Sequence, residues 1–487
     1  MCGSGTGFAT GKTKIRLENH DLSAFVPATS SIISANAIKA TPSSSPALAI
    51  VTYNDNERKH YMYVAYSRFG ENAQNVIQLC EHHSIPNPSR RKNEVLIRVH
   101  ASTISNSDCA IRRGEWPNIS MDPYIIPGVA LVGIVTESGK KKSRASFSFS
   151  SPIQPGDIVL ALVTTGGNAR YSCVAKNQLV KVPPQINPEL AVCLTETYLT
   201  AFQILHLGHK GSMRYRENSL NGESILIMGG YSPLGKAIIE LCRAGGAEFC
   251  YALTNPEQSQ TTKKNRRESG LSFQYDAIRK WGGIPLSNDP QDWLTLIGRQ
   301  IDTFITVYDP SDFARCNERI SGEHWKALRK DGNVIIVCSY PGMNIEEQRE
   351  NVFGSAPNNN NGGGRENGNA KSFRIPSCRL SGREKLADRA IWYNLFDSRG
   401  NERGGRSTTK KDLEHLLHLL HLDLVQPEIA NRYPLSRVSK AQALLERKKK
   451  VRTVGHATGH LICSPWLVEQ KTKRGGKIKS HINGHEC

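Results

Sequence analysis

The chain has 487 residues, of which 38% are hydrophobic, and a formal net charge of +19. This length and apolar content suffice to bury a substantial core and predict two or three domains. No apolar run approaches membrane-spanning length, so we expect a soluble protein without membrane insertion. The twelve cysteines show no C-x-x-C pair or other metal-ligand spacing, which predicts reduced, mostly buried thiols in an intracellular compartment and no metal site.

Much of the positive charge falls in two clusters, residues 447–452 and 471–479. Such clusters can attract nucleic acid or other anions. Neither cluster carries the interleaved aromatic residues on which bases stack. We therefore expect solvated or anion-attracting surface there, and nucleic acid is not an expected partner.

Residues 1–46 are rich in Ser, Thr and Ala and end in a stretch of Ser and Pro, which is typical of a disordered extension. The scarcity of acidic residues also suits a transit segment, although the segment is not rich in arginine and lacks the apolar region of a secretory signal. Both interpretations stay open. They correspond to a cytoplasmic protein and to an organellar one, in a mitochondrion or plastid.

Residues 47–199 contain short β-rich segments separated by Pro and Gly, such as 94–100 with its alternating character and 156–162. Such a pattern predicts a small β-barrel-like domain. From about residue 200, apolar strands alternate with helical patterns, and 302–308 and 333–338 read as later buried strands. This alternation predicts a doubly wound α/β domain.

The most informative segment of the second domain is the turn 229–235, with the sequence GGYSPLG. An apolar run, 224–228, precedes it, and residues with helical apolar spacing follow. A strand, a tight turn and a helix in this order aim backbone N–H groups and the positive end of a helix dipole at a dinucleotide pyrophosphate. The candidate cofactor-binding residues of this turn are Gly230, Tyr231, Ser232, Pro233, Leu234 and Gly235.

The turn is not a complete G-x-G-x-x-G, because Ser232 stands where the middle glycine belongs. Any strand-to-helix turn in an α/β protein collects glycines, and that interpretation stays open for the turn alone. A second apolar strand, 249–253, follows the predicted helix and supplies the βαβ context that the motif requires.

Cofactor preference is expected to depend on residues just after this second strand. NAD-binding folds place Asp or Glu about 20 residues past the glycines, where this chain has Asn255. Without a carboxylate to repel a 2′-phosphate, and with Lys264 among the basic residues downstream, the sequence favours NADPH over NADH. The alternative is that those basic residues form a solvated helix face. Cys338, at the end of a predicted strand, is a further cofactor-binding candidate.

Two low-complexity segments, 358–369 and 398–409, are expected to be surface insertions. Helical periodicity returns at 412–420, and the chain is expected to be ordered again as far as about residue 467. Residues 468–487 are Gly- and Lys-rich, which predicts a basic, flexible tail.

The order of these landmarks resembles the medium-chain dehydrogenase/reductase superfamily, and within it the zinc-free, quinone oxidoreductase-like branch. The segments that carry the resemblance are 94–102, 107–117, 126–135, 155–159, 198–202 and the glycine turn. The resemblance implies a GroES-like domain (47–199), a Rossmann NADP-binding domain (200–423) and a C-terminal segment (424–467) that returns to the first domain. Because dimers are common in the family, it also implies a possible homodimer.

Zinc-dependent relatives have a Cys shortly before the Asp of one motif and Gly-His-Glu in the next. This chain has Ser105–Asp108 and Gly128–Ala130 there, so neither place offers a zinc ligand. Without a Lewis acid an alcohol is hard to ionise, whereas a quinone or an α,β-unsaturated carbonyl already accepts hydride. The resemblance therefore implies a zinc-independent, NADPH-dependent oxidoreductase acting on such electrophiles.

The proton donor of this reaction is left open by the motifs. The Tyr and Asn that some relatives carry are Ala110 and Ser105 here. Ser105, Asp108 and Tyr124 are the candidate catalytic residues, with loop anchoring as the alternative role of Asp108 and packing as that of Tyr124. By resemblance, Thr200 is expected near the nicotinamide ribose.

Two other functions stay open at this point. An enoyl-thioester reductase of the enoyl-CoA type is compatible with the basic charge, because CoA carries phosphates. A nucleotide-sensing or RNA-binding protein with little turnover is compatible with the substituted glycine and the missing Tyr.

Overall fold

In the computed structural model the described residues are 61–89, 91–138, 152–207, 211–254, 264–287, 289–308, 324–338, 390–396, 408–448 and 459–467. All of them belong to one compact unit, residues 53–482, whereas the second unit, 1–52 with 483–487, contains none of them. The predicted extension at 1–46, the insertion at 358–369, most of the insertion at 398–409 and the basic tail at 468–487 lie outside the described residues.

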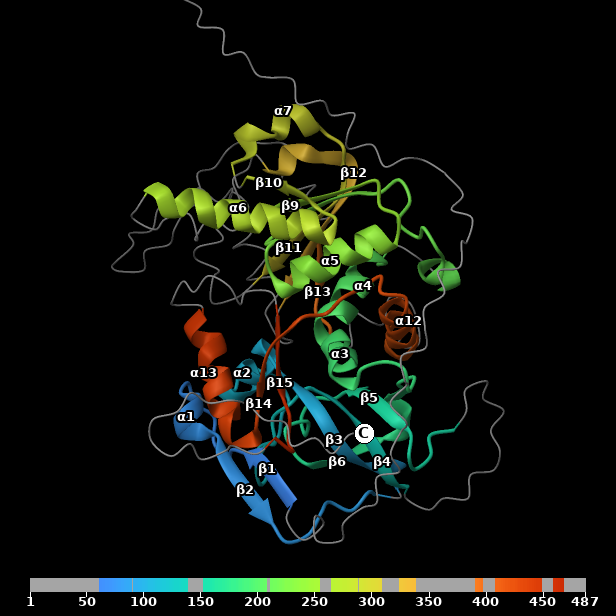
Figure 1. The fold of residues 1–487 in the computed structure, drawn as a ribbon, viewed down its shortest axis with the longest axis vertical. Coiled ribbons are helices and arrows are strands. Elements are labelled where there is room, and N and C mark those ends of the chain that lie inside the picture. The colour runs from blue at the N-terminus through green and yellow to red at the C-terminus, as the bar shows by residue number, and fades with distance from the viewer. Residues whose placement is uncertain are drawn as a thin grey trace, which may run out of the picture. The chain divides into compact units, whose positions relative to one another are not determined.

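The first part of the chain forms a seven-stranded sheet, in which β3 is central (Figure 1). Its strands are β3 (Glu94–Ile104), β4 (Ala130–Ser138), β5 (Ile158–Leu162), β6 (Tyr171–Ala175), β7 (Leu179–Lys181), β14 (Ile429–Tyr433) and β15 (His460–Cys463). The order is β14-β15-β3-β4-β5-β7, and β6 also pairs with β3. A separate hairpin pairs β1 (Tyr61–Ala65) with β2 (Gln78–His82). The two segments expected as strands, 94–100 and 156–162, correspond to β3 and β5.

The C-terminal segment returns to this sheet. β15 pairs antiparallel with β3, with Leu461 opposite Ile104, and β14 pairs parallel with β15. Beyond β15, the indole Nε1 of Trp466 donates to the carbonyl of Val99 at 2.8 Å, and the Arg98 guanidinium lies 3.9 Å from the indole centroid. The return expected from the resemblance is therefore present.

The second sheet has six strands, all parallel. They are β8 (Ser224–Met228), β9 (Phe249–Leu253), β10 (Ile284–Leu286), β11 (Ile301–Tyr308), β12 (Leu328–Cys338) and β13 (Ala390–Tyr393). Their order, β10-β9-β8-β11-β12-β13, corresponds to 3-2-1-4-5-6, which is the order of dinucleotide-binding folds. Ligands in such sheets bind beyond the carboxyl ends of the strands where the order reverses, here between β8 and β11.

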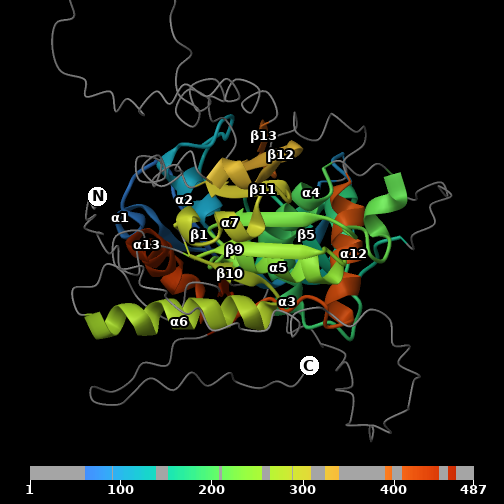
Figure 2. The ribbon, with the colours of Figure 1, turned by 90° about the horizontal axis from the view of Figure 1, so that it is seen from above.

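Helices flank the parallel sheet (Figures 1 and 2). α5 (Pro233–Ala244) contacts β9, and α6 (Lys264–Trp281) contacts β10 and α5. α7 (Leu294–Ile297) lies between β10 and β11 in the chain. The interior strand β8 is buried at Ile225, Leu226 and Ile227, as a parallel sheet covered on both faces requires.

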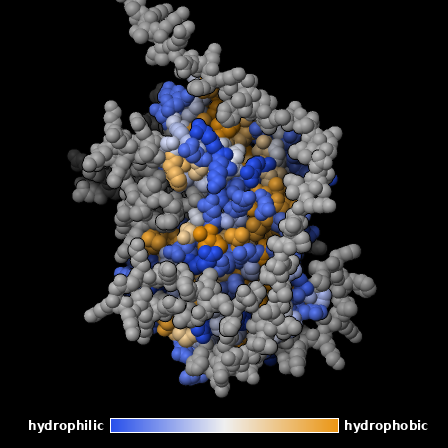
Figure 3. Space-filling model, in the orientation of Figure 1, coloured by the Kyte–Doolittle hydropathy of each residue, from blue (hydrophilic) through white to orange (hydrophobic). Residues whose placement is uncertain are grey.

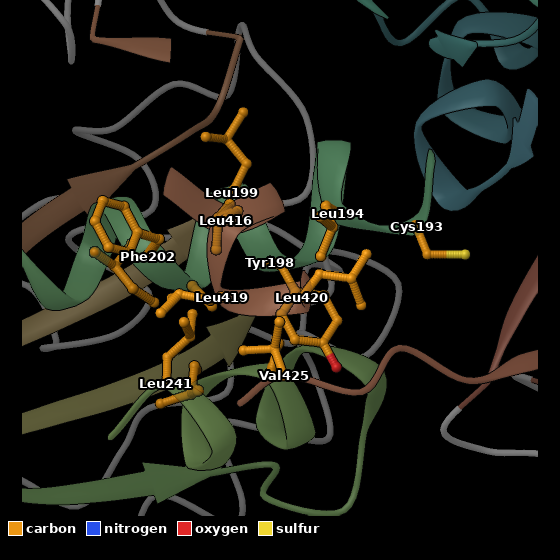
Figure 4. Packing of buried hydrophobic residues seen from close by; sticks show 14 of the residues in the cluster. Cys193, Leu194, Tyr198, Leu199, Phe202, Leu241, Leu416, Leu419, Leu420 and Val425 are labelled. Atoms are coloured by element: carbon orange, nitrogen blue, oxygen red, sulfur yellow. The ribbon is translucent and has the colours of Figure 1, made fainter. Parts of the chain in front are cut away.

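A continuous hydrophobic core joins the two sheets. It includes Val132 and Leu160 of the first sheet and Ile227 and Ile305 of the second. Between them lie α3 (Pro188–Cys193), a π-helix (Leu194–Tyr198), α4 (Leu199–Leu205) and α12 (Thr409–His421). Figure 4 shows leucines of α12 packed against the π-helix and α4.

The remaining helices are short or cover the first sheet. They are α1 (Ala73–Val76), α2 (Asn106–Arg113), α13 (Val438–Lys448) and the 3-10 turns at Lys176–Gln178, Gly211–Tyr215, Pro290–Asp292, His324–Ala327 and Leu435–Arg437. α2 and α13 are joined by the fully buried Arg112, whose Nε donates to Gln442 at 2.9 Å and whose guanidinium also pairs with Glu446.

Hydrophilic and hydrophobic residues are interspersed on the face shown in Figure 3. Within the described ranges, no helix combines the length and the apolar character needed to cross a membrane.

Candidate active site

The glycine turn lies between β8 and α5, as the sequence predicts. Ser232 is the N-cap of α5 and Pro233 occupies its first turn, both favoured choices at these positions. The Ser232 hydroxyl accepts from the N–H of Gly235 at 3.0 Å and donates to the carbonyl of Gly229 at 2.7 Å. The serine at the place of the middle glycine therefore fixes the turn and the start of the helix.

Two glycines of the turn are required by close backbone approach. A Cβ at Gly235 would lie 2.3 Å from the carbonyl oxygen of Gly230 and 2.6 Å from that of Gly229. At Gly230 it would lie 2.5 Å from the Cβ of Ala252 on β9. Side chains at either position would separate α5 from the sheet, so these glycines set the close helix-to-strand packing of a dinucleotide-binding turn.

The helix N-terminus offers fewer donors than a turn of three glycines would. The N–H of Gly235 is already bonded to Ser232, and Pro233 has no N–H. Among the described residues, Leu234 is the first-turn residue whose N–H has no protein partner. The turn fits the phosphates of a dinucleotide through that N–H and the positive end of the α5 dipole.

The ring of Tyr231 packs against α6. Its ring stacks on Trp281, with centroids 5.8 Å apart, and meets the edge of Phe273 at 6.1 Å. The side chain is 7% exposed, and burial raises the pKa of its hydroxyl. These contacts give Tyr231 a packing role, and its predicted role in cofactor binding stays a prediction.

Asp108 connects two sequence motifs of the first domain. Its carboxylate accepts from the N–H of Ser105 at 2.9 Å and from the N–H of Gly128 at 2.7 Å. The side chain is fully buried, and burial, with the nearby charge of Glu196, raises its pKa from 3.8 to about 7. A carboxylate that accepts from two backbone N–H groups can hold two loops together. This geometry gives Asp108 an anchoring role that requires no part in catalysis.

Glu196, which no sequence motif singled out, joins Ser105 and Ser107. The Ser107 hydroxyl donates to Glu196 Oε1 at 2.5 Å and the Ser105 hydroxyl to the same oxygen at 3.2 Å. Glu196 lies on the π-helix, a distortion found often at functional sites, and is partly exposed. Burial of its carboxyl raises its pKa, against the opposing effect of the two serine hydrogen bonds.

A signal for Glu196 exists in the sequence. Within residues 190–202 it is the single charged side chain in an otherwise apolar or uncharged stretch. A carboxylate at such a place needs a partner, because a buried charge is stable only when paired or hydrogen-bonded. The partners themselves, about 90 residues earlier in the chain, are not readable from the sequence.

Tyr124, the third catalytic candidate, is in contact with β1. It is 42% exposed, and its ring stacks on Tyr63 of β1 with centroids 5.7 Å apart. Tyr63 in turn stacks on Tyr61. This stack gives Tyr124 a packing role, and its predicted catalytic role stays a prediction.

Of the remaining cofactor-binding candidates, only Thr200 has a described side chain. Thr200 is on α4, two residues after the π-helix, and is half-buried. Lys264 begins α6 and Cys338 ends β12, but their side chains lie outside the described residues, as does Asn255 entirely. Preference between NADPH and NADH therefore stays a prediction.

Tyr198 takes part in a network of charged side chains centred on the buried Lys236 and Glu240. Lys236 Nζ is 3.3 Å from Glu240 and 3.1 Å from Glu428, and it also donates to the carbonyl of Gln426. The Tyr198 hydroxyl donates to Glu240 at 2.7 Å. The network connects α5, the π-helix and the returning C-terminal segment, and the sequence analysis did not anticipate it.

In the described part of the chain, no group of three or more His, Cys, Asp or Glu side chains is arranged to hold a metal ion. Zinc-dependent relatives carry ligands at two places. In this chain the first place, Ser105–Asp108, contains the cap of α2, and Ser105 bonds to Glu196. The second place, Gly128–Ala130, leads into β4. Zinc independence remains a prediction from these residue types.

The fold and the glycine turn define a class: a GroES-like β domain joined to a dinucleotide-binding domain. Residues 91–184 match the family model described as the alcohol dehydrogenase GroES-like domain. Among solved structures, a human synaptic vesicle membrane protein VAT-1 homolog-like protein aligns with a TM-score of 0.55 at 16% identity, over 84% of this chain and 99% of that one. The quinone oxidoreductase of Coxiella burnetii aligns with a TM-score of 0.54 at 18% identity, over 83% and 99%.

The chain therefore contains an alcohol dehydrogenase GroES-like domain and is similar to quinone oxidoreductases, as the resemblance to the medium-chain dehydrogenase/reductase superfamily implies. The quinone oxidoreductase of Homo sapiens is 27% identical over 213 residues, which are 43% of this chain and 59% of that protein. The Mus musculus protein of the same name is 28% identical over 256 residues, 52% of this chain and 67% of that one. The chain thus spans somewhat more than half of the length of the relatives it matches. A mycobacterial protein solved in complex with NADPH shares the fold, with a TM-score of 0.54 at 15% identity over 83% of this chain and 100% of that one.

Proposed function

We propose that this protein is an NADPH-dependent oxidoreductase that transfers hydride to a quinone or to an α,β-unsaturated carbonyl. The observation that carries the proposal is the turn between β8 and α5, at the point where the strand order of the parallel sheet reverses. The names of the relatives, and the bound NADPH of one structural neighbour, support the cofactor and acceptor classes.

The chain's own residues would act mainly by binding and orientation. Gly230 and Gly235 let backbone and ligand approach closely, and the N–H of Leu234 with the α5 dipole binds phosphate. Nicotinamide, when bound, supplies the hydride. Asp108 accepts from the N–H of Ser105, the N-cap of α2, and from the N–H of Gly128, just before β4. These two hydrogen bonds would fix the position of Ser105.

The test is oxidation of NADPH and of NADH by the purified protein against ortho-quinones, para-quinones, alkenals and enoyl-CoA. Calorimetric titration of both nucleotides runs alongside. We expect turnover selective for NADPH with a quinone or an alkenal. Enoyl-CoA as the preferred acceptor would replace the proposal with the thioester reductase, and tight NADPH binding without turnover would favour a sensor. Failure to bind either nucleotide would contradict the assignment of the turn.

A matched pair of variants tests the turn itself. Ser219 is a half-buried serine outside the turn, and its hydroxyl contacts His206. Leu234→Asp puts a carboxylate on the first turn of α5, where it would repel phosphate, while Ser219→Ala leaves the turn unchanged. We expect the first variant to weaken NADPH binding by about tenfold or more and the second to leave it unchanged. Equal affinities in both would place the phosphates elsewhere.

A further inference from the structure

Reduction of a quinone or an activated alkene consumes one proton with each hydride. The residues singled out by the motifs do not supply an evident donor, because Asp108 is engaged with two backbone N–H groups and Tyr124 stacks on Tyr63. Glu196 is a carboxyl that the fold brings to the same group of side chains, and the anchoring of the motifs does not require it.

The position of Glu196 is fixed from two directions. Ser107 and Ser105, on and before the first turn of α2, both donate to its Oε1. The π-helix that carries it leads directly into Thr200 on α4, the residue expected near the nicotinamide ribose. Oε2 is not used by the serines, and the side chain retains partial exposure. One oxygen is therefore held by the two serines, while the other accepts no hydrogen bond from them.

The charge around Glu196 favours retention of a proton. Asp108 lies close enough to raise the cost of ionising both carboxyls, and its own pKa is raised to about 7 by burial and by Glu196. The pKa of Glu196 is raised by burial, which its two serine hydrogen bonds oppose. Burial of both carboxyls, together with the charge of Glu196 near Asp108, disfavours a state in which the two are ionised at the same time.

Other titratable groups around the pair do not exchange a proton near neutral pH. Burial raises the pKa of Tyr66 and raises that of Cys463 to about 12, and both act electrostatically with Asp108. His460 of β15 contacts Thr197 beside Glu196, and burial lowers its pKa to about 4, so that it is neutral. A permanent charge on the same helix as Asp108, Arg112, is bonded to Gln442 and paired with Glu446.

We propose that Glu196 donates the proton that completes the reduction, with Ser105 and Ser107 as positioning residues that hold its carboxyl; this inference rests on the proposed function. The acceptor gains the hydride with its electron pair and is reduced by two electrons, as the nucleotide is oxidised. The O–H bond of Glu196 breaks while an O–H or C–H bond forms on the acceptor, and water then returns a proton to the carboxylate. One proton is consumed in each turnover.

The first experiment compares the wild type, Glu196→Gln and the control Glu217→Gln, whose glutamate is exposed in a surface turn. The assays use NADPH with 9,10-phenanthrenequinone and with trans-2-hexenal between pH 5 and 9. Wild-type kcat is expected to fall as the pH rises above the pKa of the pair, because the donor must be protonated. Glu196→Gln is expected to lower kcat by about 100-fold or more and to remove that pH limb, with KM and NADPH affinity unchanged.

A second variant separates positioning from donation. Ser107→Ala removes the hydrogen bond that stabilises the ionised form of Glu196, so its pKa rises and the pH limb moves to higher pH. Infrared difference spectra of the nucleotide-free protein give a readout that is independent of turnover. The spectra are recorded in the Asp108→Asn background, which removes the band of Asp108 itself. A protonated-carboxyl band that titrates above the usual range of a glutamate is expected there, and it should be missing when Glu196→Gln is added.

The outcomes are distinguishable. Wild-type turnover with unaffected kcat in Glu196→Gln overturns the inference and leaves the proposed function intact. The inference is also overturned if the pH limb persists in Glu196→Gln, or if the infrared band is unchanged there. A wild type without turnover on any acceptor overturns the proposed function, and the donor role with it.

Discussion

At the scale of single residues, Asp108 predicts an unusual dependence of stability on pH. A pKa raised from 3.8 to about 7 in the folded state means that the folded chain holds this proton more tightly than the unfolded chain. The resulting stabilisation is complete below about pH 4 and is lost as the pH rises through 7. Between pH 4 and 7.5, the free energy of unfolding of the wild type should therefore fall by about 2–4 kcal/mol more than that of Asp108→Asn, whose amide cannot ionise.

Urea unfolding of both proteins at the two pH values measures this change. Asp276→Asn is the control, because that carboxylate is 68% exposed and makes a surface pair with Arg279. Parallel pH dependences in the wild type and Asp108→Asn would contradict the raised pKa.

Ser232 supplies a second prediction at this scale. Ser232→Gly frees the N–H of Gly235, which the serine hydroxyl now occupies, and a glycine N-cap costs only a few tenths of a kcal/mol. With one more donor for phosphate, NADPH should bind about 3- to 10-fold more tightly. Calorimetric titration measures the change, and weaker binding would show that Ser232 itself contacts the ligand.

At the scale of elements, the Lys236 network connects α5 to the returning C-terminal segment. Lys236 and Glu240 are each 4% exposed at the side chain, so removing Lys236 leaves the Glu240 carboxylate buried without the cation paired with it. Lys236→Met should lower the free energy of unfolding by about 3 kcal/mol. Lys236→Met combined with Glu240→Gln should recover most of the loss, since the amide oxygen of the new glutamine still accepts from Tyr198.

A double-mutant cycle measured by urea unfolding gives the coupling between these two residues. The control is Arg279→Met, which breaks an exposed pair with Asp276 and should cost less than about 1 kcal/mol. Additive effects in the cycle would mean that Glu428 and Gln426, rather than Glu240, account for the placement of Lys236.

At the scale of the whole molecule, the continuous core predicts that the two sheets unfold together. Leu416 of α12 is fully buried against α4 (Figure 4), so Leu416→Ala should cost about 2–5 kcal/mol. Leu422, just past the same helix, is 51% exposed, and Leu422→Ala should cost less than about 0.5 kcal/mol. Circular dichroism and tryptophan fluorescence should give one coincident transition, and separate transitions would contradict a shared core.

The elements were largely predictable from the sequence, because periodicity and turn chemistry act over a few residues. The predicted strand at 302–308 is β11, the helical pattern at 412–420 lies within α12, and the turn 229–235 joins β8 to α5. The run at 333–338 is only the second half of β12, which starts at Leu328 because its earlier residues also extend beside β11.

The candidate site was predictable only in part. Ser105 and Asp108 were found because they belong to a motif, and the structure places them together. Glu196 was missed. Tyr124, proposed for its nearness in sequence to the second motif, stacks on Tyr63 of β1, and its catalytic role stays a prediction. Nearness along the chain does not decide which side chains meet across two domains.

Local sequence patterns were enough to predict most strands and helices, the place of the glycine turn and the family that the chain resembles. Those properties depend on local backbone preferences and on motifs in a fixed order. The contact of Ser107 with Glu196, 89 residues away, and that of Lys236 with Gln426, 190 residues away, could be seen only in the folded chain. Such contacts result from the packing of whole elements around a common core, which no local pattern encodes.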